Sequence, residues 1–282
     1  MVLATRILIF VLAASSLNLL IGFGGLVSFG HAAYFGGGAY LVAILMHHGV
    51  SLLWITWPLA IFGCALAAAA IGAICLRTRG VYFIMITLAF AQMVYYLLVS
   101  LKTYGGDDGL PMAARSELGF GPSLKSPAAL YYAVVLVVAA AHWWLFRLIN
   151  SRFGRALQAV RENATRAEAI GLPVYRVQLA CFVIGGALAG LAGVLLANLN
   201  MLASPNALMW TQSGTLMIMV ILGGAGSLYG GAAGAALLLV LEEVLAEYSV
   251  HWQLGLGVVL LLVVLFSPNG LAGLFAGRRS DD

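Results

Sequence analysis

The chain has 282 residues, of which 63% are hydrophobic and 9% are charged, and its formal net charge is +4 at pH 7. A soluble domain usually contains about 25% charged residues, so this composition excludes an ordinary soluble protein and indicates an integral membrane protein. The basic residues are concentrated between positions 147 and 176, which contain six arginines. We expect no nucleic-acid partner.

Hydropathy predicts an all-α fold, a polytopic membrane bundle of about eight to ten transmembrane helices in a single domain, 1–282. The apolar runs are continuous, whereas the strands of a membrane barrel alternate between apolar and polar residues. The first run is also compatible with a signal peptide, but no polar domain follows it, so we interpret it as a span. Glycines, prolines and charges delimit nine predicted spans: 3–21, 26–46, 51–76, 80–101, 128–147, 177–199, 209–225, 228–246 and 252–268.

Glycine is unusually frequent at the start of the second predicted span, in the sequence GFGGLVSFGHAAYFGGGAY at 22–40. GGLVS at 24–28 is echoed by GGAGS at 223–227, and an apolar helix is expected after each. The echo indicates a two-fold internal pseudo-repeat with glycine-interrupted segments, or it is a chance match. Paired interruptions of this kind are typical of a transporter's central pathway.

These segments supply the candidate pathway residues. The alternatives are that the glycines only let helices touch and that the histidine is hydrogen-bonded between helices. A third glycine-rich stretch, GGALAGLAG at 185–193, predicts close helix contact through Gly186 and Gly190. The candidate pathway set is Gly24, Gly25, Ser28, His31, Gly223, Gly224 and Ser227.

Two polar loops give the orientation in the membrane. The loop 148–176 is short and rich in arginine, so the positive-inside rule places it in the cytoplasm, together with Arg77 and Arg79. The loop 102–127 has balanced charges and is expected to be extracytoplasmic. Counting spans from these loops places the N-terminus outside.

The cytoplasmic loop contains a predicted amphipathic helix, GRALQAVRENATRAEAIG at 154–171. Its apolar positions recur at helical spacing, and Gly171 followed by Pro173 marks its C-terminal end. The helix either binds a partner protein or lies on anionic lipid. The apolar positions are Ala156, Leu157, Val160, Ala164, Ala167 and Ile170.

Several chemistries find no support in the sequence. The two lysines, Lys102 and Lys125, each follow a leucine, so the Gly-Lys-Ser/Thr of a P-loop is absent. No histidine pair has the spacing of a zinc site, and no nucleophilic triad stands out, so we expect neither a metal nor an enzyme. The three cysteines, Cys64, Cys75 and Cys181, are expected to be small core residues, and Glu242 and Glu243 to mark an interfacial helix end more than a proton relay.

Four stretches resemble the permease subunits of ATP-binding-cassette importers for branched-chain amino acids, of the LivM type. They follow one another in the order expected of that family and cover most of the chain. They are LNLLIGFGGLVSFGHAAYFGGGAYLVAIL at 17–45, RTRGVYFIMITLAFAQMVYYLL at 77–98 with YGGDDGLP after it, GRALQAVRENATRAEAIGLPVYRVQLACFVIGGALAGLAG at 154–193, and ILGGAGSLYGGAAGA at 221–235.

The resemblance implies that the whole chain is one transmembrane permease domain and that 148–176 carries a coupling loop similar to the EAA loop, which docks on an ATPase subunit. The match to the wider importer pattern is partial, because a single alanine follows Glu168 and Gly171 comes three residues after it. The residues expected to couple to the ATPase are Arg155, Arg161, Glu162, Asn163, Arg166, Glu168, Ala169 and Gly171.

The resemblance also implies the partners. They are two cytoplasmic ATPases that bind ATP and magnesium, a related second permease in a heterodimer, an extracytoplasmic substrate-binding protein and membrane lipid, while this chain binds no cofactor itself. The location implied is the cytoplasmic (inner) membrane of a prokaryote. Branched-chain amino acids are the expected substrates. The alternatives are other amino acids, amides or urea, a stand-alone secondary carrier or channel, and a purely structural subunit.

Overall fold

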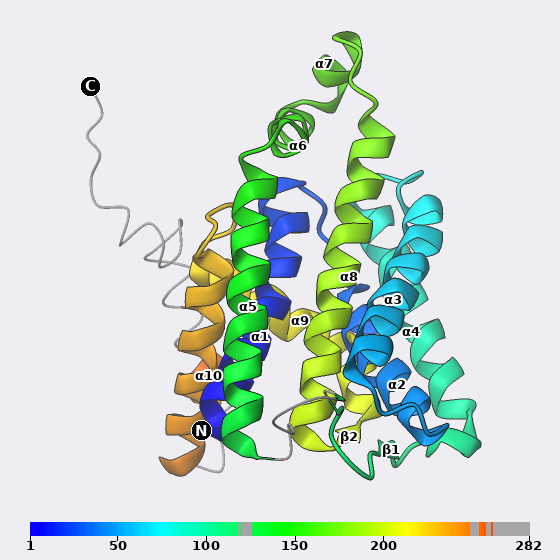
Figure 1. Ribbon diagram of the computed structural model, residues 1–282. Helices are drawn as coiled ribbons and strands as arrows, with labels where there is room; N and C mark the ends of the chain where they lie inside the picture. Colours follow the sequence, from blue (N-terminus) through cyan, green and yellow to red (C-terminus); the bar gives the residue numbers. More distant parts are fainter. Residues whose placement is uncertain (118, 120–125, 249–253, 258–260, 262–282) are drawn as a thin grey trace.

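The computed structural model describes residues 1–117, 119, 126–248, 254–257 and 261. Nearly all regular structure in this part of the chain is helical (Figure 1). The elements are α1 Val2–Asn18, the π-helix η1 Leu19–Phe23, α2 His31–His47, α3 Leu53–Cys75, α4 Val81–Ser100, η2 Lys102–Tyr104, β1 Leu110–Pro111, α5 Pro127–Ile149, α6 Arg152–Glu162, α7 Ala164–Ala169, α8 Val174–Asn200, β2 Leu202–Ala203, η3 Pro205–Leu208, α9 Trp210–Gly223 and α10 Gly230–Tyr248.

Five helices of the described part are long and apolar enough to cross a membrane. They are Val2–Phe23, Leu53–Cys75, Val81–Ser100, Pro127–Ile149 and Val174–Asn200. The predicted all-α polytopic bundle is therefore confirmed. The predicted ninth span, 252–268, lies outside the described residues except for 254–257 and 261.

Two predicted spans are wrong in length. The span expected over 26–46 is the 17-residue helix α2, which begins at His31, and the span expected over 209–225 is the 14-residue helix α9. At 1.5 Å per residue these helices are about 26 Å and 21 Å long, shorter than the roughly 30 Å hydrocarbon core. Residues 24–30 and 204–209 run into the bundle as non-α-helical chain before each helix begins. Both helices therefore start inside the protein.

The helices differ strongly in how deeply they are buried. The span Val2–Phe23 is 78% buried and forms the centre of the bundle, with α5, α8, α9 and α10 around it. By contrast, α4 is 17% buried and α5 is 28% buried. These outer helices present large apolar side chains such as Met85, Tyr96 and Leu136 to the surroundings, as helices that contact lipid do.

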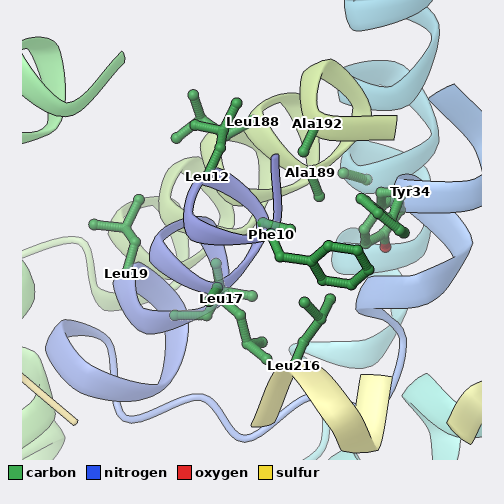
Figure 2. Close-up of a cluster of buried hydrophobic side chains, with 14 of the residues drawn as sticks. Phe10, Leu12, Leu17, Leu19, Tyr34, Leu188, Ala189, Ala192 and Leu216 are labelled. Atoms are coloured by element: carbon green, nitrogen blue, oxygen red, sulfur yellow. The ribbon is translucent and has the colours of Figure 1, made fainter. Parts of the chain in front are cut away.

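The centre of the bundle is packed with aliphatic and aromatic side chains from four helices (Figure 2). Phe10 of α1 extends toward α2, where its ring centroid lies 5.6 Å from that of Phe35. Leu12 of α1 and Leu188 of α8 lie next to each other, and Leu216 of α9 covers the opposite side of α1. This packing fixes the position of α9 against the central helix.

Small residues on α8 bring its backbone close to α2 and α3, as the sequence 185–193 predicts. A Cβ atom at Gly186 would lie 2.5 Å from that of Ala68, and one at Gly190 would lie 2.6 Å from that of Cys64. At Gly193 the same atom would lie 2.8 Å from the carbonyl carbon of Phe35. Since such contacts leave no room for a side chain, the glycines set the separation of these helices.

The two ends of the bundle carry different segments (Figure 1). One end, which we call the arginine-rich end, carries α6, α7 and the turn between α3 and α4. The opposite end, which we call the strand-pair end, carries the antiparallel pair β1 and β2 and the N-terminus. The N-terminus thus lies opposite to the arginine-rich segment, in the relative position that the sequence predicts.

Candidate functional site

The N-terminal ends of the two short helices meet inside the bundle. The backbone N–H of Ala32, in the first turn of α2, donates a hydrogen bond to Ser213 Oγ in the first turn of α9 at 2.8 Å. Ser16 Oγ of the central helix lies 2.7 Å from His31 Nε2. The positive dipole ends of two helices are thereby brought into one region of the bundle.

The polar candidates of the second predicted span lie at this meeting point. Ser28 and His31 are both fully buried. Ser28 Oγ accepts a hydrogen bond from the Gly30 N–H at 3.1 Å, and His31 Nδ1 has no partner among the described residues. Neither residue lines the cavities described below.

The candidate glycines have different surroundings. A Cβ atom at Gly24 would lie 2.8 Å from the Leu20 carbonyl oxygen, and one at Gly223 would lie 2.9 Å from the Gly234 nitrogen, so both permit close packing. Gly25 has a positive φ of 66° and lines a cavity of about 220 Å³ at the arginine-rich end, together with Thr78 and Gln178.

The turn between α9 and α10, which carries the echoed segment 223–227, lies against the end of α1 and against Gly22 of η1. Asn18, at the end of α1, donates from Nδ2 to the Ser227 carbonyl at 2.7 Å and accepts at Oδ1 from the Gly226 N–H at 3.1 Å. Gly224 and Gly226 both have positive φ angles, so the turn between α9 and α10 requires glycine at these positions. Asn18 therefore joins η1 to this turn.

Arg161 of α6 reaches the contact between η1 and the α9–α10 turn, which we call the glycine junction. Its Nη1 donates a hydrogen bond to the Gly22 carbonyl. A Cβ atom at Gly25 would lie 3.1 Å from Arg161 Cγ, and one at Gly226 would lie 3.1 Å from Arg161 Nη1. The arginine therefore contacts both glycine segments, and it links the arginine-rich loop to the ends of α1 and α9.

The predicted single helix over 154–171 is two helices. Asn163 has extended backbone angles, φ −158° and ψ 100°, which end α6, and its Oδ1 accepts a hydrogen bond from the Arg166 N–H at 2.9 Å to begin α7. Gly171, at φ 84°, ends α7 as predicted. An amide side chain that can cap a helix therefore prevails over the apolar periodicity.

The apolar face is also shorter than predicted. Leu157, Val160 and Ala167 are buried against the bundle, but Ile170 is 72% exposed at the end of α7. The predicted coupling residues are all exposed: Arg155, Arg161, Glu162, Asn163, Arg166, Glu168, Ala169 and Gly171. The loop thus presents charged side chains and the apolar side chain of Ile170 outward.

Two polar features of the bundle were not predicted from the sequence. Arg6 of α1 and Glu242 of α10 form an ion pair of 3.4 Å, although they are 236 positions apart. Glu242 is thus paired across two helices and does not stand alone at a helix end. The run Thr211–Gln212–Ser213 opens α9, and polar residues grouped within a predicted span were the available signal. Among the described residues, no group of three His, Cys, Asp or Glu side chains could hold a metal ion.

Comparison with known proteins shows which protein family has this sequence pattern. The family model described as "Branched-chain amino acid transport system / permease component" matches residues 1–266. The chain belongs to this family. Hydropathy, the short paired helices and the family membership agree on a multi-pass membrane protein that is the permease component of a transport system.

Named relatives of this branched-chain amino acid permease family are similar along nearly the whole chain. The high-affinity branched-chain amino acid transport system permease protein LivM of Salmonella typhimurium (strain LT2) is 30% identical over 95% of this chain and 68% of the relative. LivM of Escherichia coli (strain K12) is 29% identical over the same shares. The permease protein LivH of Salmonella typhimurium is 26% identical over 94% of this chain and 91% of the relative. No solved structure is significantly similar to this chain.

Proposed function

We propose that this chain is a permease subunit of an ATP-binding-cassette importer that moves branched-chain or related amino acids across the inner membrane of a prokaryote. Its relatives named LivM and LivH are described as permease proteins of branched-chain amino acid transport systems. This chain is similar both to LivM and to LivH, and this double similarity supports a heterodimer of two related permease subunits. The other partners proposed are two cytoplasmic ATPases and an extracytoplasmic binding protein.

The observation that carries the coupling role is the Arg161 contact with both glycine segments. The exposed surface of α6 and α7 is proposed to dock on an ATPase, with Ile170 as its apolar contact and the surrounding charges setting the register. Arg161 lies on the same loop and hydrogen-bonds to Gly22 inside the bundle. A movement of the ATPase would therefore displace the junction that joins α1, α9 and α10.

The short helices suggest how this displacement opens a path. The Ala32 to Ser213 hydrogen bond joins the N-terminal ends of α2 and α9. If α9 moves with the glycine junction, this bond breaks and the freed N–H groups face the solute path. Backbone groups exposed within a membrane are tolerated where they line a cavity, and here they would face the carboxylate of a zwitterion.

The double substitution Arg161→Ala with Glu168→Ala tests this function. In proteoliposomes that contain the complete transporter, we expect ATP hydrolysis to continue while amino acid uptake per ATP falls by roughly 5- to 150-fold, the usual range of an allosteric coupling energy. Arg152→Ala is the control, because Arg152 is an exposed arginine at the start of the same helix.

Normal coupling in the double variant would remove the loop from the mechanism. Uptake without ATP by the purified chain alone would instead favour a stand-alone carrier. A panel of leucine, isoleucine, valine, polar amino acids, short amides and urea identifies the substrate class in the same assay. The proposed specificity fails if uptake is confined to amides or urea.

A further inference from the structure

A second cavity lies between α1, α9 and α10, away from the glycine junction. Its volume is about 250 Å³. The polar residues that line it are Arg6 of α1, Gln212 and Thr215 of α9, and Glu242 of α10. Glu242 is twelve residues from the start of α10, which places it about 18 Å toward the strand-pair end. The cavity therefore lies in the half of the bundle nearer the strand-pair end.

The two charges in this cavity have unused bonding capacity. Arg6 Nη2 and Glu242 Oε1 are 3.4 Å apart, a long contact for an ion pair, and the side chains are 41% and 24% exposed. The arginine also lies over the Phe10 ring, at 5.8 Å from its centroid. A guanidinium has five N–H donors and a carboxylate two acceptor oxygens, so each group can bind a ligand as well. Charges retained within a membrane bundle are typical of a substrate pathway.

The start of α9 adds one hydrogen-bond donor and one acceptor to the same cavity. Gln212 Nε2 is buried and has no hydrogen-bond partner among the described residues. Thr215 Oγ1 donates to the Thr211 carbonyl at 3.2 Å, which leaves its lone pairs free. Gln212 lies in the first turn of α9, where the helix dipole favours an anion. An orphaned buried amide N–H beside an arginine matches a carboxylate.

The remaining wall of the cavity is apolar and mostly aliphatic. Ile218 of α9 and Leu238 and Leu239 of α10 line it. The cavity thus combines a cation and amide donors, an anion, and an apolar wall, which are the three complements of an aliphatic α-amino acid. We propose that it is a substrate site in which Arg6 and Gln212 bind the carboxylate, Glu242 binds the ammonium group, and the leucines contact the side chain. This inference rests on the proposed function and locates the substrate within it.

A binding measurement on the purified transporter, without the binding protein, tests the site. Tritiated L-leucine is the probe, and L-leucinamide, which lacks the carboxylate, and 4-methylpentanoate, which lacks the amine, are competitors. We expect Glu242→Gln and Arg6→Gln each to weaken leucine binding roughly ten-fold or more, the effect of losing one charge-assisted hydrogen bond. In Arg6→Gln the preference for leucine over leucinamide should disappear.

Two control variants distinguish a role in leucine binding from a role in holding α1 and α10 together. Glu243→Gln removes the neighbouring exposed carboxylate of α10 and should leave leucine binding unchanged. The exchange Arg6→Glu with Glu242→Arg keeps an ion pair between α1 and α10 but reverses its direction. We expect the exchanged protein to keep the thermal stability of the wild type and still to bind leucine weakly.

Wild-type leucine affinity in the exchanged protein would overturn the site, because the pair would then only fasten the helices. The site would also be overturned if Arg6→Gln kept the preference for leucine over leucinamide. The same holds if the wild-type transporter took up leucine normally but showed no leucine binding in this measurement. Leucine binding that depends on both charges, in a transporter with no ATP-driven uptake, would support the site and overturn the proposed function instead.

Discussion

At the scale of single residues, the contact of Gly193 with α2 is a tight packing constraint. A Cβ atom at this position would lie 2.8 Å from the Phe35 carbonyl carbon and 3.1 Å from the Ala39 nitrogen. These are backbone atoms, so no side-chain rotation can relieve the clash. The two helices must separate if any side chain is added there.

We therefore expect Gly193→Ala to lower the free energy of unfolding by about 1–3 kcal/mol, the usual effect of overpacking a core. Gly37→Ala is the matched control, since nothing lies within 4 Å of a Cβ atom at Gly37. Alanine is the better helix former, so Gly37→Ala should be neutral or stabilising by up to about 1 kcal/mol. Denaturation of both variants in the same detergent measures the difference. Equal stabilities would contradict this account of the α2–α8 contact.

At the scale of elements, the break between α6 and α7 shapes the exposed loop. Asn163 ends one helix and caps the next, through the Arg166 N–H to Oδ1 hydrogen bond of 2.9 Å. Without the break, α6 would continue in a straight line and carry Ile170 to another position. The direction of the exposed surface thus depends on one amide side chain.

Asn163→Ala should expose the α7 amides to solvent. Loss of a helix cap typically costs about 1 kcal/mol, so we expect amide exchange at Arg166 to become roughly five-fold faster, while Asn163→Asp, which keeps an acceptor oxygen, stays near the wild type. Asn150→Ala is the control, because the Asn150 side chain bonds the Phe146 carbonyl in a different helix. Hydrogen exchange followed by mass spectrometry reports these rates. Unchanged exchange in Asn163→Ala would show that the cap does not hold α7.

At the scale of the whole molecule, the sequence predicts what depends on local composition. Uncharged apolar runs predict the membrane helices, and the small residues of 185–193 predict the close contacts of α8. Average hydropathy cannot show that α2 begins only at His31, because residues 24–30 are mostly apolar whether or not they are helical. The difference is one of backbone path, which glycine leaves open.

Contacts between residues far apart in the chain could also not be predicted from the sequence. Arg6 meets Glu242, and Arg161 meets Gly22 and Gly226, because the bundle brings their helices together. Nothing in local periodicity records such pairs. The predicted roles of the coupling and pathway residues accordingly remain predictions, but the structure connects the two groups through a single side chain.

That connection predicts two separable defects. The exposed Ile170 is the large apolar group of the proposed docking surface, and Arg161 is its link to the glycine junction. Ile170→Asp should place a charge in the contact with the ATPase and lower the amount of ATPase that copurifies by roughly ten-fold or more. Ile170→Val keeps an apolar side chain there and should retain the ATPase.

Arg161→Ala should behave in the opposite way. The docking surface stays intact, so the ATPase copurifies in normal amounts, but the junction no longer moves with the loop and uptake falls while ATP hydrolysis continues. Copurification and transport measured on the same preparations distinguish the two defects. If Arg161→Ala also lost the ATPase, the arginine would belong to the docking surface, and the path from the loop to the short helices would have to run through the buried contacts of Leu157 and Val160 instead.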